Sequence, residues 1–124
     1  MHRRIIGLDI GGTTFSSALF NEKLDVLKVS DKKLIGEMES TDDLLSSLSK
    51  QILDFNLNSI DGIGISCPGP LDSKNGIILN TPNLKLIQNV KLKEEIESRC
   101  STTVVIENDA NLFALGEWYQ QKQN

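Results

Sequence analysis

The segment from Asp9 to Thr14 carries residue types that bind phosphate and magnesium. It reads Asp-Ile-Gly-Gly-Thr-Thr and follows a short apolar run. Two adjacent glycines let backbone N–H groups approach an anion, because no Cβ stands in the way. The hydroxyls of Thr13 and Thr14 can donate to phosphate oxygens, and Asp9 can hold a magnesium ion against them. The alternative is a plain hairpin turn at Gly11 and Gly12, although a carboxylate enclosed at the end of an apolar strand needs a partner.

A second polar group lies where a predicted strand changes into the last predicted helix. It reads Glu107-Asn108-Asp109-Ala110-Asn111. Ligands of α/β proteins bind at the carboxyl ends of parallel strands. There Asp109 could take the proton from an attacking hydroxyl, while the Asn108 amide orients that hydroxyl. Asn is also a preferred helix N-cap, so residue type alone favours a capping role for Asn108.

Two loops contain further residues that suit a ligand rich in hydroxyl groups. They are Ser66-Cys67-Pro68-Gly69-Pro70 and Asn80-Thr81-Pro82-Asn83-Leu84. Gly69 permits close approach, and the Asn83 amide offers both a donor and an acceptor. Taken singly, both segments are ordinary loops. Cys67 is predicted to be a small core residue, because nothing near it resembles a histidine-activated thiol.

The framework that must position these residues is predicted from hydrophobic periodicity. Apolar runs bounded by turn residues predict five strands, over residues 3–10, 13–20, 25–34, 60–67 and 102–106. Helical spacing predicts three helices, over residues 40–53, 89–99 and from about 108 onward. The order βββαβαβα predicts an α/β fold, with a mixed five-stranded sheet flanked by helices.

The expected faces of these elements follow from their periods. Ser40 is predicted to cap the first helix, which has acidic residues in its first turn. Its buried face should consist of Leu44, Leu45, Leu48, Ile52 and Leu53. In the strand over 60–67, one face is apolar, whereas Gly62, Gly64 and Ser66 leave the other almost bare.

Composition excludes several classes of protein. The 124 residues carry a formal net charge of −4 and no basic stripe, so we expect no nucleic-acid partner. Two distant cysteines, Cys67 and Cys100, and a single histidine cannot build a disulfide framework or a zinc site by themselves. No run approaches the roughly 20 apolar residues of a membrane span. We therefore expect a cytoplasmic protein with no membrane partner.

Together, these segments resemble the ROK sugar-kinase family within the actin–hexokinase–heat-shock-chaperone ATPase superfamily. The resemblance runs through essentially the whole chain. The matching segments are GLDIGGTT (Gly7 to Thr14), GIGISCPGPLD (Gly62 to Asp72), NTPNL (Asn80 to Leu84) and IENDANLFALGE (Ile106 to Glu117). The predicted order βββαβαβα is also the repeated core of that superfamily, an actin-like domain of the ribonuclease H-like type.

The resemblance implies a glucokinase-like enzyme that uses ATP and Mg²⁺ to phosphorylate a hexose hydroxyl. Asp109 would be the general base that activates the sugar hydroxyl. Gly69, Asn83, Asn108 and Asp109 would contact the sugar. The phosphates and the metal would be handled by Asp9, Gly11, Gly12, Thr13 and Thr14, with Asp9 nearest the Mg²⁺.

The resemblance also implies that residues 1–124 are the N-terminal lobe of such a kinase. The C-terminal lobe of the family, with the adenosine site and often a zinc site, is absent, so we expect this chain alone to be inactive. A separated lobe would expose apolar surface near the last helix, where homo-oligomers could form. The alternative is a sugar-sensing domain of the ROK repressor branch. Those repressors begin with a helix-turn-helix, whereas this chain begins at the first strand.

Overall fold

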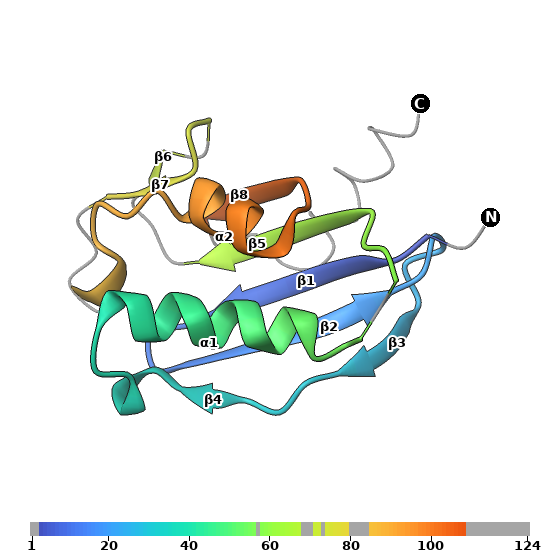
Figure 1. Cartoon of the computed structure of the whole chain (residues 1–124), viewed down its shortest axis with the longest axis horizontal. Helices are drawn as coiled ribbons and strands as arrows, with labels where there is room; N and C mark the ends of the chain where they lie inside the picture. The colour runs from blue at the N-terminus through green and yellow to red at the C-terminus, as the bar shows by residue number, and fades with distance from the viewer. Residues whose placement is uncertain (1–2, 57, 68–70, 73, 80–84, 109–124) are drawn as a thin grey trace.

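The computed structural model describes residues 3–56, 58–67, 71–72, 74–79 and 85–108, which form a mixed sheet with helices packed on it (Figure 1). The strands of the sheet are β1 (Ile5–Ile10), β2 (Thr14–Phe20), β3 (Val26–Val29), β4 (Lys33–Leu34), β5 (Gly62–Cys67) and β8 (Val104–Asn108). Their order is β3-β2-β1-β5-β8, and β4 also pairs with β2. β1, β5 and β8 are parallel, whereas β2 is antiparallel to β1 and β3. The predicted meander followed by parallel strands is confirmed.

Two helices cover the same face of this sheet (Figure 1). They are α1 (Thr41–Leu53) and α2 (Leu92–Cys100). The predicted cap of α1 is confirmed, since the Ser40 hydroxyl accepts a hydrogen bond from the Asp43 N–H at 3.0 Å. The Arg99 guanidinium on α2 forms an ion pair with Asp42 on α1 at 2.9 Å. In the described part of the chain, no helix is long and apolar enough to cross a membrane.

The smaller elements lie between the main ones. They are the short 3₁₀ helices η1 (Ile35–Glu37) and η2 (Lys85–Ile87), and the hairpin of β6 (Leu71–Asp72) and β7 (Ile77–Ile78). The short apolar run over residues 77–79 of the sequence includes both residues of β7. The last predicted helix, from about residue 108 onward, falls outside the described residues apart from its first position.

The main core fills the space between the sheet and the two helices. Four of the five residues of α1 that were predicted to face inward are buried. Leu44, Leu45, Leu48 and Ile52 are at most 4% exposed. Leu53 is 51% exposed, so its predicted burial is wrong. Leu53 lies in the last turn of α1, about 100° around the helix from Ile52 and outside the stripe that the four buried residues form.

The two cysteines are part of this core. Cys67 is 1% exposed and Cys100 is 8% exposed, and neither forms a disulfide. Burial raises the pKa of the Cys100 thiol, which keeps it protonated and unreactive. The prediction that Cys67 is a small core residue is confirmed.

The single strand predicted over residues 25–34 is wrong, because the chain leaves the ladder between β3 and β4. The cause is a polar network under the break. The Ser30 hydroxyl accepts the Ser17 N–H at 2.7 Å, and the Gln51 amide donates to the Asp31 carbonyl at 3.0 Å. The Ser17 hydroxyl in turn donates to Gln51 Oε1 at 2.8 Å. Side chains thus replace strand pairing at this point and join the sheet to α1.

The second helix begins at Leu92 rather than at Asn89. Asn89 has a φ of 60°, in the left-handed region, which an α-helix does not accommodate. Its N–H donates instead to the Ile78 carbonyl at 2.7 Å, so residue 89 belongs to the connection with β7. Burial of Leu92 and Ile96 on one face of α2 agrees with the predicted periodicity.

We expect Gln51→Ala to lower the free energy of unfolding by about 1–3 kcal/mol, because it removes the hydrogen bonds that Gln51 forms with the buried Ser17 hydroxyl and with the Asp31 carbonyl. Urea denaturation followed by circular dichroism measures this change. The control is Lys50→Ala on the same helix turn, which removes an exposed ion pair and should change stability by no more than about 0.5 kcal/mol. Equal effects of the two substitutions would contradict a structural role for the network.

Candidate active site at the carboxyl ends of the parallel strands

The pairing of four neighbouring strands places polar residues in one row across the sheet. In this register Asp9 pairs with Ser16 on β2 and with Ser66 on β5, and Ser66 pairs with Glu107 on β8. Because neighbouring strands lie about 4.8 Å apart, the backbones at Asp9 and Glu107 are about 10 Å from each other. The row lies close to the carboxyl ends of β1, β5 and β8, where α/β folds bind ligands.

Of this row, Asp9, Ser16 and Ser66 lie on the face of the sheet that α1 and α2 do not cover. Side chains alternate along a strand, and Leu8 and Ile10, on either side of Asp9, are both buried in the main core. On the same face as Asp9, Gly7 pairs with Gly64, which agrees with the predicted bare face of the strand over 60–67. Small residues therefore lead up to the polar row. Residue type and spacing do not identify Ser16 as a site residue, because its position beside Asp9 depends on the length of the turn between β1 and β2.

Asp9 is exposed, so the expectation that its carboxylate is enclosed at the end of the strand is wrong. The reason is its position, near the end of β1 on the face opposite the helices. Within the described part of the chain, no hydrogen bond or ion pair occupies its carboxylate. A solvated carboxylate beside a backbone turn remains available to a cation.

The turn between β1 and β2 is held by its backbone rather than by side chains. The Gly11 N–H donates to the Thr14 carbonyl at 2.8 Å, and the Ile35 N–H donates to the Thr13 carbonyl at 2.8 Å. Gly12 and Thr13 are exposed, while Gly11 and Thr14 are partly so. The connection is therefore fixed at both ends and open to solvent at its tip.

The two glycines of this turn are not required by its conformation. Hairpin turns that demand glycine do so because they need positive φ, and neither Gly11 nor Gly12 has it. A Cβ added at Gly12 would meet nothing within 4 Å, and one at Gly11 would lie 3.4 Å from the Thr14 carbonyl. The plain hairpin turn thus leaves Gly12 unexplained, whereas a ligand that approaches the backbone closely would require it.

Asn108 is the last residue of β8 and pairs with Cys67, the last residue of β5. The strand predicted over 102–106 begins at Val104 and ends at Asn108, at the edge of the sheet that carries the polar row. Asn108 thus lies at the same end of the sheet as Asp9. Of the other predicted site residues, Asp109, Gly69 and Asn83 lie outside the described residues.

Hydrogen bonds anchor the chain on both sides of residues 80–84. The Ile78 N–H donates to the Val90 carbonyl at 3.1 Å, and the Asn89 N–H donates to the Ile78 carbonyl at 2.7 Å. The Thr41 hydroxyl, in the first turn of α1, donates to the Leu86 carbonyl. These bonds determine where the chain leaves β7 and where it returns to the core.

The β6–β7 hairpin has a tightly specified turn. The Asn75 side chain and backbone N–H groups donate to the Asp72 carboxylate at 2.8 and 3.2 Å, and they hold the pKa of that carboxyl below its usual value. Gly76 has a φ of +69°, and a Cβ there would lie 2.2 Å from the Cβ of Lys93. In contrast to Gly12, this glycine is required by the fold itself.

Comparison with known proteins identifies the family. The ROK family profile matches residues 5–124. The chain belongs to the ROK family. A glucokinase from Thermotoga maritima is 37% identical over 122 residues, which cover 94% of this chain and 37% of that protein. This ROK family member thus spans well under half of that relative's length.

Solved structures agree with this assignment. A ROK glucokinase from Streptomyces griseus in complex with glucose and AMPPNP superimposes with a TM-score of 0.76 at 27% identity, covering 94% of this chain and 36% of that one. A ROK family transcriptional regulator, a homologue of the E. coli MLC protein, gives a TM-score of 0.73 at 27% identity, covering 86% of this chain and 28% of that one. The predicted actin-like α/β fold of this ROK chain is confirmed.

Two glycine substitutions distinguish a structural glycine from one that serves a ligand. Gly12→Ala should leave stability unchanged or raise it by up to about 1 kcal/mol, because open space and a permitted φ accept the methyl group. Gly76→Ala should lower stability by at least about 1–2 kcal/mol, since it combines positive φ with a steric clash. Thermal and urea unfolding of both variants measure the difference. A large loss with Gly12→Ala would mean that the turn itself needs this glycine.

Proposed function

We propose that this chain is the N-terminal lobe, over residues 1–124, of an ATP-dependent hexose kinase. The observation that carries the proposal is the open turn at Gly12 beside the exposed carboxylate of Asp9, at the sheet edge where β8 ends at Asn108. The proposed phosphate site and the end of β8, directly before Asp109 in the sequence, thus lie at the same edge of the sheet. Membership of a family that includes glucokinases supports the same conclusion.

The residues present fit a magnesium nucleotide. The exposed Asp9 carboxylate suits Mg²⁺, which binds through one or two carboxylates together with phosphate oxygens. The backbone N–H of Gly12 and the hydroxyls of Thr13 and Thr14 would face the phosphates, while the bond from the Gly11 N–H to the Thr14 carbonyl would hold the turn in place. Bound ATP and Mg²⁺ would supply the phosphoryl group and neutralise its charge.

The sugar would lie beside the ends of β5 and β8. In this proposal Asp109 accepts the proton of the reacting sugar hydroxyl. Asn108 and Asn83 hold neighbouring hydroxyls through their amides, and Gly69 allows the ring to approach the backbone. These roles require positioning more than covalent chemistry, as is general for phosphoryl transfer.

The chain spans 37% of the Thermotoga maritima glucokinase, so we propose that a second lobe supplies the rest of the nucleotide and sugar contacts. The 124-residue chain alone should then give no measurable turnover in a coupled kinase assay. A fusion of residues 1–124 to the remaining part of that glucokinase should phosphorylate glucose in the presence of ATP and Mg²⁺. Full turnover by the chain alone would contradict the division into lobes.

In that fusion, Asp109→Asn should lower kcat by at least about 10³-fold, because it removes the proton acceptor. Glucose binding, followed by the fluorescence of Trp118 and by calorimetry, should change little. The control is Asp61→Asn, which alters an exposed carboxylate just before β5, at the opposite end of the strand. Retained activity in Asp109→Asn would remove Asp109 from the mechanism.

A second candidate function is sugar sensing without catalysis, favoured by the similarity to the ROK transcriptional regulator. A sensor and a kinase would share the sugar-binding residues but differ in the use of Asp9 and Gly12. We expect Gly12→Val in the fusion to weaken nucleotide binding and leave glucose binding intact. Glucose binding with neither nucleotide binding nor turnover in the unsubstituted fusion would favour the sensor.

A further inference from the structure

Ser66 on β5 is a buried polar residue whose hydroxyl has no hydrogen-bond partner in the described part of the chain. Its side chain is 7% exposed. The other buried polar side chains among the described residues all form hydrogen bonds; they are Ser17, Ser49 and Gln51. A buried hydroxyl without a partner costs free energy, so the few that native proteins retain have an identifiable cause. The residues beside Ser66 therefore bear on its role.

The Ser66 side chain lies on the same face of the sheet as the Asp9 carboxylate. Ile65 and Cys67, on either side of it along β5, are buried in the main core, so Ser66 points the other way. In the parallel pairing of β1 with β5, Ser66 lies directly beside Asp9. The two strands are about 4.8 Å apart, a separation that a serine hydroxyl and a carboxylate can span with one hydrogen bond.

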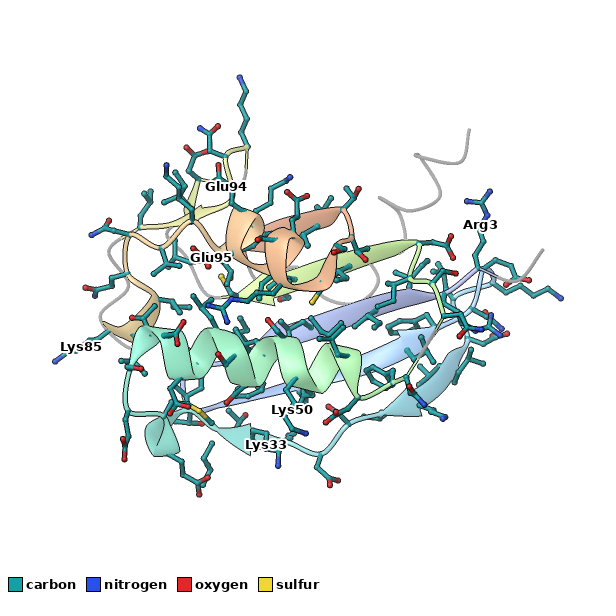
Figure 2. The ribbon with its side chains drawn as sticks, in the orientation of Figure 1. Arg3, Lys33, Lys50, Lys85, Glu94 and Glu95 are labelled. Atoms are coloured by element: carbon teal, nitrogen blue, oxygen red, sulfur yellow. The ribbon has the colours of Figure 1, made fainter. Side chains whose placement is uncertain are left out.

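No basic side chain of the described residues neutralises the Asp9 carboxylate. Asp9 is exposed, and it takes part in none of the ion pairs in the described part of the chain. Lys33 and Lys50 extend outward from β4 and α1 rather than toward β1 (Figure 2). The carboxylate and the neighbouring Ser66 hydroxyl are thus an acceptor and a donor, side by side, that lack other partners among the described residues.

We propose that Ser66 is a positioning residue for the cation at Asp9. Its hydroxyl donates a hydrogen bond to one oxygen of the Asp9 carboxylate and leaves the second oxygen for the metal ion. Carboxylates that bind metal ions are themselves hydrogen-bonded, and these bonds fix their orientation. The bond forms when the cation holds the carboxylate in one rotamer. This inference rests on the role of Asp9 in the proposed function, although it requires neither a sugar nor phosphoryl transfer.

Ser16, on the other side of Asp9, suits this role less well. The Gly11 N–H donates to the Thr14 carbonyl, so the pair two positions along, Asp9 with Ser16, is also a hydrogen-bonded pair of the antiparallel ladder. The Cα atoms of such a pair are about 5.5 Å apart, farther than in the pairing with Ser66. The Ser16 side chain is also partly exposed, and water competes for its hydroxyl. A hydrogen bond from the buried Ser66 is stronger, because the local dielectric is lower.

The proposal explains why the sheet retains a buried hydroxyl at a cost in stability. Ser66 gains a partner only when Asp9 holds a cation. Ser66→Ala should therefore weaken cation binding without lowering the stability of the chain. A serine with a purely structural role behaves in the opposite way, because its replacement breaks a bond that is already present. Ser17 on β2 is such a serine, since its hydroxyl donates to Gln51 Oε1 at 2.8 Å.

Titration of the ¹⁵N-labelled 124-residue chain with Mn²⁺, followed by NMR, tests the role of Ser66. Mn²⁺ favours the same oxygen ligands as Mg²⁺ and broadens the signals of nearby amide groups. We expect broadening of residues 11–14, reversed by excess Mg²⁺ and removed by Asp9→Asn. Ser66→Ala should raise the apparent Kd of this broadening by about tenfold or more. Broadening near the exposed carboxylate of Asp54 is the internal reference and should not change.

Ser17→Ala is the matched control, because Ser17 is 3% exposed and lies in the same sheet but faces α1. This variant should lower the melting temperature by about 3 °C or more and leave the affinity for Mn²⁺ unchanged. Ser66→Ala should show the reverse pattern, with weaker Mn²⁺ binding and an equal or higher melting temperature. Circular dichroism gives the melting temperatures and verifies that both variants are folded.

The possible failures of this inference and of the proposed function are distinguishable. Equal Mn²⁺ affinity of Ser66→Ala and the unsubstituted chain would overturn the role of Ser66 and leave that of Asp9 intact. A melting temperature of Ser66→Ala as low as that of Ser17→Ala would show a structural serine and would also overturn the proposal. Absence of broadening at residues 11–14, or its persistence in Asp9→Asn, would remove the cation from Asp9 and contradict the proposed function as well.

Discussion

The parallel backbone pairing of β1 with β5 and of β5 with β8 is the constraint on which the candidate site depends. Parallel strands all present their carboxyl ends at one edge, and the register decides which residues meet there. Asp9 thereby lies beside Ser66, and Ser66 beside Glu107, although these residues are up to about 100 positions apart in the sequence. A shift of one residue in either pairing would move this polar row to the opposite face of the sheet.

The distribution of helices decides which face of the sheet can do chemistry. α1 and α2 cover one face and bury the branched side chains of the parallel strands. Opposite them, Gly7 and Gly64 lie side by side and lead to the polar row. The glycines at the two turns differ in what the fold requires of them. Gly12 has room for a side chain, whereas the positive φ of Gly76 and the nearby Lys93 side chain require a glycine there. A glycine that the fold does not need is the more informative about function.

Much of the fold could be predicted from the sequence, because helix capping and hydrophobic periodicity depend on residues that are close together in the chain. Ser40 followed by acidic residues and an apolar stripe was sufficient to place α1, and alternating apolar runs placed β1, β2 and β5. The errors occurred where distant side chains decide the backbone. Gln51 on α1 donates a hydrogen bond to the Asp31 carbonyl at the point where the predicted third strand is interrupted. The Asn89 N–H donates to the Ile78 carbonyl, so Asn89 is not part of α2. Neither partner could be identified from sequence spacing.

The sequence by itself determined the element order, the family resemblance and the residues able to bind phosphate and magnesium, because these depend on residue type and short-range spacing. The tertiary structure decided the rest. It placed Ser16 and Ser66 beside Asp9, exposed the Asp9 carboxylate, and left β3 and β4 as an open edge. Each of these depends on strand register and on which face the helices cover. Both arise from backbone pairing and burial between segments far apart in the chain.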